Sequence, residues 1–144
     1  MLPDKETAGR LTSQGLPINR GWALMTGRPR IIILDDDASM LGALTRVLRI
    51  HGFEIETFGS VQDFLTGAHL EGARCLILDV NLGGRSGIEL RKQLASQGVS
   101  PPVIFITAIE SDSLRTEALQ AGCVACLNKP FPSSDLIDAL ERVA

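Results

Sequence analysis

The chain has 144 residues, 44% hydrophobic and 22% charged, which is the balance of one globular domain and not of a disordered chain. A formal net charge of −3 provides no basic surface for a phosphate backbone, so we expect no direct binding of nucleic acid. No apolar run reaches the roughly 18 residues of a membrane span, and no secretory signal is recognisable. Together with three cysteines, an odd number that suits reduced thiols, this predicts a cytoplasmic protein without a membrane partner.

The first 29 residues differ in composition from the rest of the chain. Residues 1–29 mix prolines, glycines and scattered charges without helical or strand periodicity, and Ile31 then opens an apolar run. We therefore predict a flexible N-terminal extension at 1–29 and a folded domain at 30–144. One hypothesis takes Met25 as the natural start of the protein. The alternative is a tail or a short partner-binding segment.

From Ile31 onward, short apolar strands alternate with amphipathic helices. In the first helix Leu41, Leu44 and Leu48 recur at helical spacing, and Gly52 ends the pattern. Apolar strands that alternate with helices indicate a parallel sheet covered on both faces, hence a doubly wound α/β fold. The five predicted strand and helix pairs are, in chain order, 31–34 with 40–50, 53–58 with 61–68, 75–78 with 88–97, 103–106 with 114–121, and 124–127 with 136–143.

Reactive side chains follow four of the five predicted strands. They are Asp35, Asp36 and Asp37 after the first strand, Asp79 after the third, Thr107 after the fourth and Lys129 after the fifth. Ligands of open α/β sheets bind at the carboxyl ends of the strands. Gathered carboxylates repel by about 1 to 4 kcal/mol per pair, which a hard cation such as Mg²⁺ relieves. A carboxylate nucleophile, a metal, a hydroxyl and an ammonium group are the components of phosphoryl transfer to an aspartate.

As an ordered set, these residues and their neighbours resemble the response-regulator receiver domain of bacterial two-component systems. The resemblance covers residues 30–143. It implies a flavodoxin-like (βα)5 sandwich whose five parallel strands have the order 2-1-3-4-5. The matching segments are Asp35-Asp36 after Ile31–Leu34, Asp79 after Leu76–Leu78, Gly87, Thr107-Ala108 after Val103–Ile106, and Lys129-Pro130-Phe131.

The resemblance also implies a phosphoacceptor and a metal site. Asp79 would be the phosphoacceptor, and Mg²⁺ would be held by Asp36, Asp79 and the backbone carbonyl of Asn81. Asp35 would assist through water. Asp37 is better explained as a cap for the following helix than as a ligand.

Two further residues would contact the phosphoryl group. Thr107 would turn inward and donate a hydrogen bond to it, Ala108 would leave room for it, and Lys129 would pair with it. In similar domains the bond between Lys129 and Pro130 is cis, and the same is expected here.

The implied partners are proteins. A sensor histidine kinase would supply the phosphoryl group. Phosphorylation would then alter the surface made by helix 114–121, strand 124–127 and helix 136–143, which would meet an output protein or domain or a second copy of the chain. The chain would catalyse no reaction beyond its own phosphorylation and dephosphorylation.

Some features depart from the family pattern. Cys126 occupies the position of an aromatic switch residue, and the chain has no tyrosine. A binding module independent of phosphorylation therefore remains an alternative. Another is a haloacid-dehalogenase-like phosphatase, suggested by Asp35-x-Asp37, although the chain is short for that fold and lacks its later acid pair. Cys123 and Cys126 form a C-x-x-C, which we interpret as core packing because residues three apart on a strand point to opposite faces.

Overall fold

Five parallel strands form one sheet in the computed structural model, which describes residues 28–143. The strand order is β2-β1-β3-β4-β5, as predicted. The hypotheses about residues 1–27, including the start at Met25, lie outside the described residues. The strands are β1 (Arg30–Leu34), β2 (Glu54–Phe58), β3 (Cys75–Asp79), β4 (Val103–Thr107) and β5 (Ala125–Asn128).

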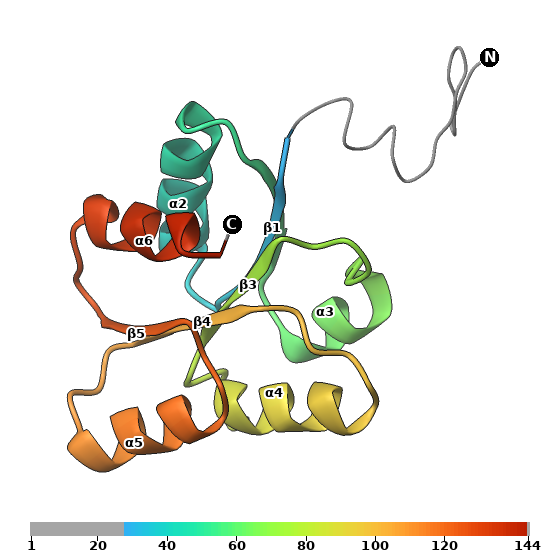
Figure 1. Cartoon of the computed structure of the whole chain (residues 1–144), viewed down its shortest axis with the longest axis vertical. Coiled ribbons are helices and arrows are strands. Elements are labelled where there is room, and N and C mark those ends of the chain that lie inside the picture. Colours follow the sequence, from blue (N-terminus) through green and yellow to red (C-terminus); the bar gives the residue numbers. More distant parts are fainter. Residues whose placement is uncertain (1–27, 144) are drawn as a thin grey trace.

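Helices cover both faces of the sheet. Figure 1 shows α2 and α6 together on one face, and α3, α4 and α5 along the other. This arrangement is that of a doubly wound fold, in which each right-handed crossover places its helix on one face or the other. The helices are α2 (Ala38–Ile50), α3 (Val61–Gly67), α4 (Gly87–Ser96), α5 (Asp112–Gln120) and α6 (Ser133–Glu141).

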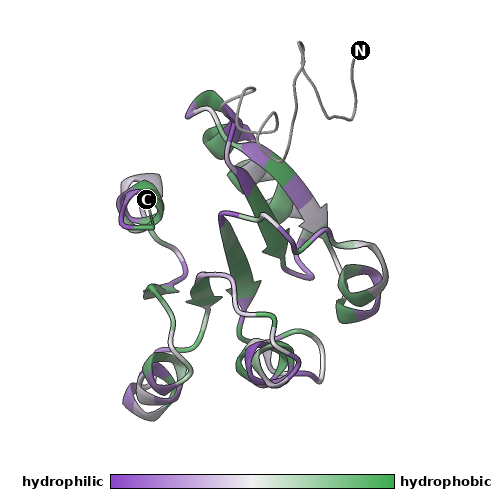
Figure 2. Cartoon of the chain, turned by 45° about the vertical axis from the view of Figure 1, so that its right-hand side comes forward, coloured by the Kyte–Doolittle hydropathy of each residue, from purple (hydrophilic) through white to green (hydrophobic). Residues whose placement is uncertain are grey.

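Each face of the sheet has its own hydrophobic core. Strands β3 and β4 are buried along their whole length, as expected for the central strands of a parallel sheet. In Figure 2 the central strands of the sheet are hydrophobic, whereas the edge strand β2 and the helices carry mixed colours because only one side of each helix meets the sheet. One core packs Ile31, Ile33 and Ile77 against α2 and α6, and the other packs Leu76, Leu78 and Phe105 against α3, α4 and α5.

Polar side chains cap the starts of α2, α3, α4 and α5, whereas α6 follows Pro132 without such a cap. The Asp37 carboxylate accepts hydrogen bonds from the backbone of Ser39 and Met40 and so caps α2, as predicted. Four helices begin earlier than we predicted: α2 at residue 38 instead of 40, α4 at 87 instead of 88, α5 at 112 instead of 114 and α6 at 133 instead of 136. The first turns of α5 and α6 are polar and exposed, so apolar periodicity alone does not reveal them.

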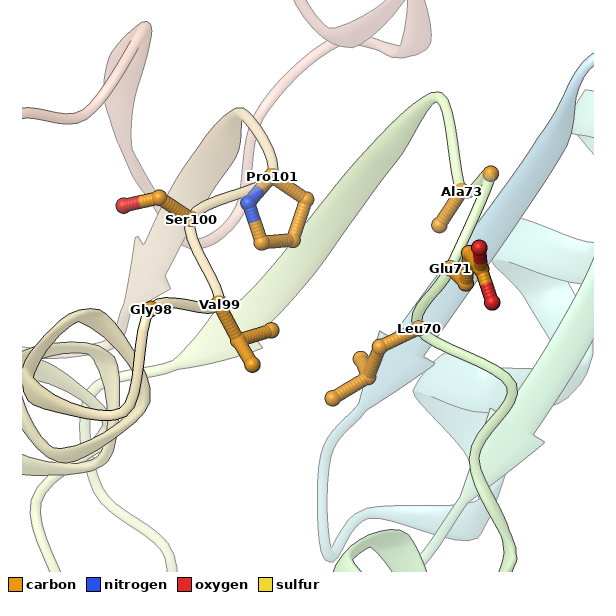
Figure 3. A pocket seen from close by; sticks show the side chains of 8 residues that line it. Leu70, Glu71, Ala73, Gly98, Val99, Ser100 and Pro101 are labelled. Carbon is orange, nitrogen blue, oxygen red and sulfur yellow. The ribbon is translucent and has the colours of Figure 1, made fainter.

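The two ends of the sheet differ in character. At the amino ends of the strands, a pocket lies between the loop before β3 and the loop before β4; Leu70 and Ala73 form one wall, and Val99 and Pro101 the other (Figure 3). The charged side chains predicted to form a site all follow the opposite, carboxyl ends. Within residues 28–143 no helix has the length and hydrophobicity of a membrane span.

Candidate phosphoacceptor site

Three carboxylates meet at the carboxyl ends of β1 and β3. These strands are neighbours, with Leu34 paired to Leu78, so the residues that follow each of them share one edge of the sheet. One oxygen each of Asp35, Asp36 and Asp79 lies within 4.8 Å of the others. We call these three residues the acidic cluster. Asp35 and Asp79 are buried, whereas Asp36 is exposed, so the cluster opens to solvent on one side.

Lys129 joins the two buried acids. Its Nζ donates to Oδ2 of Asp35 at 2.9 Å and to Oδ2 of Asp79 at 3.0 Å. The backbone around the lysine is fixed as well, because the N–H of Lys129 donates to the carbonyl of Thr107 at 2.8 Å. The peptide bond from Lys129 to Pro130 is cis. The residue after β5 is thereby brought to the acids that follow β1 and β3.

The main chain orients the same two carboxylates. Oδ1 of Asp35 accepts from the N–H of Asp37, and Oδ1 of Asp79 accepts from the N–H of Asn81, both at 2.9 Å. Each buried carboxylate therefore has one oxygen bonded to its own loop and the other to Lys129. Such fixed partners hold both groups in one orientation.

The donor set of the acidic cluster fits a divalent cation. Three carboxylates face a single ammonium group, which leaves two formal negative charges without compensation. Carboxylate oxygens with an open side for water are the ligands that Mg²⁺ accepts most readily. Asn81 is exposed at the same rim, where its main chain bridges Ser86. The residues present therefore suit Mg²⁺ in both charge and chemistry.

Burial and charge act in opposite directions on these groups. Burial raises the pKa of Asp79 above its ordinary value; bonds from Asn81 and Lys129 lower it, and the nearby charge of Asp35 raises it further. Burial alone would lower the pKa of Lys129, but its bonds to Asp35 and Asp79 outweigh that effect and the pKa is raised. The ammonium group of Lys129 therefore keeps its positive charge. The negative charge of the Asp79 carboxylate is only partly compensated by Lys129, and a bound cation would compensate the rest.

The raised pKa of Asp79 predicts a gain in stability on neutralisation. A carboxyl whose pKa is raised by folding contributes stability below its unfolded pKa of about 3.9 and loses it as the pH rises through the folded value. In the presence of a chelator, Asp79→Asn should therefore unfold at a higher temperature than wild type near pH 7, with the difference fading toward about pH 4. Thermal scans of both proteins, with Asp138→Asn on the exposed side of α6 as control, measure this; a difference that does not change with pH would contradict it.

Thr107 ends β4 beside the cluster. It lies one residue beyond Ile106, the partner of Asp79 in the sheet, and it is 2% exposed. Its Oγ1 accepts a hydrogen bond from the N–H of Ile109 at 3.0 Å, which leaves the hydroxyl hydrogen for another acceptor. The next residue, Ala108, is exposed and small. The loop after β4 is thus tied to a hydroxyl at the edge of the site.

Gly87 permits a close approach that only glycine allows. A Cβ at this position would lie 2.2 Å from the backbone oxygen of Asp79. The N–H of Gly87 donates a hydrogen bond to the carbonyl of Val80 at 2.8 Å. The start of α4 therefore packs directly on the backbone of the site. The sequence indicates Gly87 only as part of a motif, whereas the structure shows what the missing side chain makes possible.

The two cysteines near β5 pack in the core. Cys126 is 7% exposed, and Cys123 packs against the same hydrophobic cluster. Burial raises the pKa of both thiols. The interpretation as core packing agrees with this, but the geometric reason given for it is wrong: Cys123 precedes the strand, so the alternation of faces does not apply and both cysteines pack on one side.

Two residues near the site have no motif that would reveal them. Arg115 of α5 and Asn128 of β5 are hydrogen-bonded to each other at 2.7 Å, and Asn128 also contacts the loop after Thr107. The only signal in the sequence is that Asn128 precedes the lysine. Their meeting depends on how α5 packs beside β5.

Comparisons with known proteins agree with this geometry. The family model described as response regulator receiver domain matches residues 31–141. Nodulation protein W of Bradyrhizobium diazoefficiens is 36% identical over 110 residues, which are 76% of this chain and 48% of that protein. Response regulator protein TodT of Pseudomonas putida is 35% identical over 125 residues, 86% of this chain and 55% of that protein. The chain thus spans about half the length of these relatives.

Solved structures show the same fold. The response regulator StyR superposes with a TM-score of 0.73 at 39% identity, covering 80% of this chain and 58% of that one. The crystal structure of FixJ-N gives 0.72 at 29% identity, covering 80% and 92%. Because the matched stretch contains the acidic cluster, Thr107 and Lys129, we conclude that this chain belongs to the response regulator receiver domain family of two-component systems.

Proposed function

We propose that this receiver domain accepts a phosphoryl group on Asp79. The observation that carries the proposal is the buried Asp79 carboxylate, held by Lys129 at 3.0 Å and placed beside Asp35 and Asp36 at the open edge of the sheet. A carboxylate oxygen of Asp79 would form a bond to phosphorus as the phosphorus–nitrogen bond of a phosphohistidine breaks. Hydrolysis of the acyl phosphate would later return the carboxylate, so the domain would catalyse its own phosphorylation and dephosphorylation.

The surrounding residues have distinct roles in this proposal. Asp36, Asp79 and the carbonyl of Asn81 would hold Mg²⁺, with Asp35 assisting through water. When bound, the ion supplies positive charge to the acids and to the transferring phosphoryl oxygens. Lys129 would pair with one phosphoryl oxygen as a point charge.

On the opposite side of the phosphoryl group, the loop after β4 completes the site. The free hydrogen of the Thr107 hydroxyl would be donated to a second phosphoryl oxygen. Ala108, which directly follows Thr107, would leave room for the group because its side chain is small.

The partners follow from the same chemistry. A sensor histidine kinase in the cytoplasm would supply the phosphoryl group. The surface made by α5, β5 and α6 would carry the signal to an output protein, to an output domain outside this chain, or to a second copy. Relatives named as transcriptional regulators, such as FixJ, are longer than this chain, which covers 57% of FixJ. An output of that kind would lie outside the matched residues.

Two hydrogen bonds of Asp37 disfavour a phosphatase of the haloacid dehalogenase type. In such an enzyme Asp37 would act as the acid beside Asp35. Here the Asp37 carboxylate accepts hydrogen bonds from the backbone of Ser39 at 2.9 Å and of Met40 at 3.3 Å, and so caps α2. Both bonds end on Oδ1 and turn the carboxylate toward its own helix, which is the geometry of a helix cap and not of an acid directed at a substrate beside Asp35.

The test is intact mass after incubation with phosphoramidate. Wild type in the presence of Mg²⁺ should gain one phosphoryl group, and Asp79→Asn should gain none. Omitting Mg²⁺ and adding a chelator should remove the gain in wild type. The exposed-site variant Asp138→Asn serves as control and should behave as wild type. If wild type shows no gain while its fold is intact, the phosphorylation-independent binding module becomes the better interpretation.

A further inference from the structure

A hydrogen-bonded bridge joins the loop after Thr107 to helix α5. Nδ2 of Asn128 donates to the carbonyl of Ile109 at 3.0 Å, and Oδ1 of Asn128 accepts from Arg115 at 2.7 Å. The second terminal nitrogen of Arg115 donates to the carbonyl of Cys126 at 3.2 Å. The two neighbours fix the orientation of the amide, since its oxygen must face the guanidinium and its nitrogen the carbonyl. We call Arg115 and Asn128 the bridge.

The bridge ends where the phosphoacceptor site begins. Asn128 directly precedes Lys129 and pairs with Thr107 in the sheet. Both backbone polar groups of Ile109 are hydrogen-bonded: its N–H donates to Oγ1 of Thr107, and its carbonyl accepts from Asn128. Any inward turn of Thr107 therefore acts on the same residue that the bridge holds.

The small side chain of Cys126 makes the connection through Ile109 and the bridge important. In similar domains an aromatic ring at this position moves with the threonine. The Cys126 side chain is small, 7% exposed, and packed in the core with Phe105 and Ala118. It has no ring to move into the space that the threonine leaves. The bridge, in contrast, crosses from the loop to α5, which lies beside β5 in Figure 1.

We propose that Asn128 and Arg115 are positioning residues that couple the state of Asp79 to α5, in place of the missing aromatic switch. This rests on the proposed function. A phosphoryl group that takes the Thr107 hydroxyl draws the loop inward and stretches the bond from Asn128 to the Ile109 carbonyl. The amide is then released from the loop, and the hold of Arg115 on the end of β5 changes with it.

The first experiment needs no phosphorylation. Amide hydrogen exchange followed by NMR in the unmodified protein reports how firmly the loop is held. Asn128→Asp keeps an acceptor for Arg115 but removes the donor to Ile109, so exchange at Ile109 should speed up about fivefold, the factor for one ordinary hydrogen bond. Thr116→Ala, exposed and next to Arg115 on α5, is the control and should leave exchange at Ile109 unchanged. Unchanged exchange in Asn128→Asp would overturn the bridge.

The second experiment measures the coupling itself. Phosphorylation with phosphoramidate and Mg²⁺ should shift the amide resonances of α5 in wild type and in Thr116→Ala. In Asn128→Asp and Arg115→Ala these shifts should shrink at least about twofold, while those at Asp79 and Thr107 persist. Full shifts in α5 with both bridge variants would overturn the proposal. If wild type takes up no phosphoryl group, the proposed function fails instead, and the exchange result still decides whether the bridge holds the loop.

Discussion

Replacing Gly87 by alanine is expected to destabilise the domain by about 3 kcal/mol, at the upper end of the range for one extra methyl group in a packed interior. The added Cβ would lie 2.2 Å from the backbone oxygen of Asp79 and 3.0 Å from its carbonyl carbon. Both atoms belong to the backbone of β3, which cannot move without disturbing its partners on either side. Either α4 or the end of β3 must therefore shift.

The same substitution should slow phosphoryl uptake. Even a small displacement of Asp79 misplaces the attacking oxygen. We therefore expect the rate of phosphoryl uptake to fall on the order of tenfold or more. Gly42→Ala is the matched control: Gly42 also lies within a helix, but the nearest atom to its new Cβ would be 3.9 Å away on the flexible side chain of Arg46. It should stabilise α2 by about 0.5 to 1 kcal/mol.

Thermal unfolding and uptake of phosphoryl groups measure both effects. A Gly87→Ala protein as stable as Gly42→Ala would show that α4 relaxes away from Asp79 at little cost. The close packing of the helix on the site backbone would then be unimportant.

Removing the ammonium group of Lys129 should also have a large effect. Lys129→Met keeps the length of the side chain but leaves the carboxylates of Asp35 and Asp79 buried without their shared cation. The loss should be about 3 kcal/mol, or roughly 10 °C in the unfolding midpoint, near the low end for breaking a buried pair because the lysine side chain remains 16% exposed.

The loss in Lys129→Met should depend on conditions in two ways. Protonation of the acids relieves their repulsion, so the deficit should be largest at neutral pH and shrink as the pH falls. Millimolar Mg²⁺ should recover part of it, since a ligand that binds only the folded protein stabilises it by mass action. Phosphoryl uptake should not recover with the stability, because the proposed role of Lys129 is to pair with a phosphoryl oxygen, and Mg²⁺ bound at the acids would not take that place.

Lys92→Met provides the control for this prediction. Lys92 is half-exposed and lies 3.9 Å from Glu89 and 4.0 Å from Glu117, so its removal should change stability by less than about 0.5 kcal/mol. Denaturant titrations of Lys129→Met and Lys92→Met at neutral pH measure the difference in their free energies of unfolding. Equal stability of Lys129→Met and Lys92→Met would mean that the buried acids are already neutral without the lysine.

The grouping of Asp35, Asp79 and Lys129 could be predicted from the sequence for a simple reason. Parallel strands all end at the same edge of a sheet, so residues that directly follow apolar strands must meet there. The cap formed by Asp37 could also be predicted from the sequence, because it depends only on the three residues that follow. Both inferences require local pattern and connectivity, not the packing of side chains.

What could not be predicted depends on distances between packed elements. The contact between Gly87 and the Asp79 backbone follows from how closely α4 approaches β3. The bond between Arg115 and Asn128 depends on the rotation of α5 relative to β5, and neither residue stands out by type. The polar first turns before residues 114 and 136 escaped the hydrophobic pattern for a different reason, since nothing apolar marks them.

The bond between Lys129 and Asp35 joins residues 94 positions apart, nearly the full length of the domain. Between them lie all four crossovers that connect the five strands. Lys129 directly follows β5, so a fragment that ends before β5 contains Asp35 and Asp79 but not the cation that they share. The contacts of Lys129 therefore exist only in a chain whose sheet includes β1, β3 and β5, and the paired state of the acids reports that the whole domain has folded.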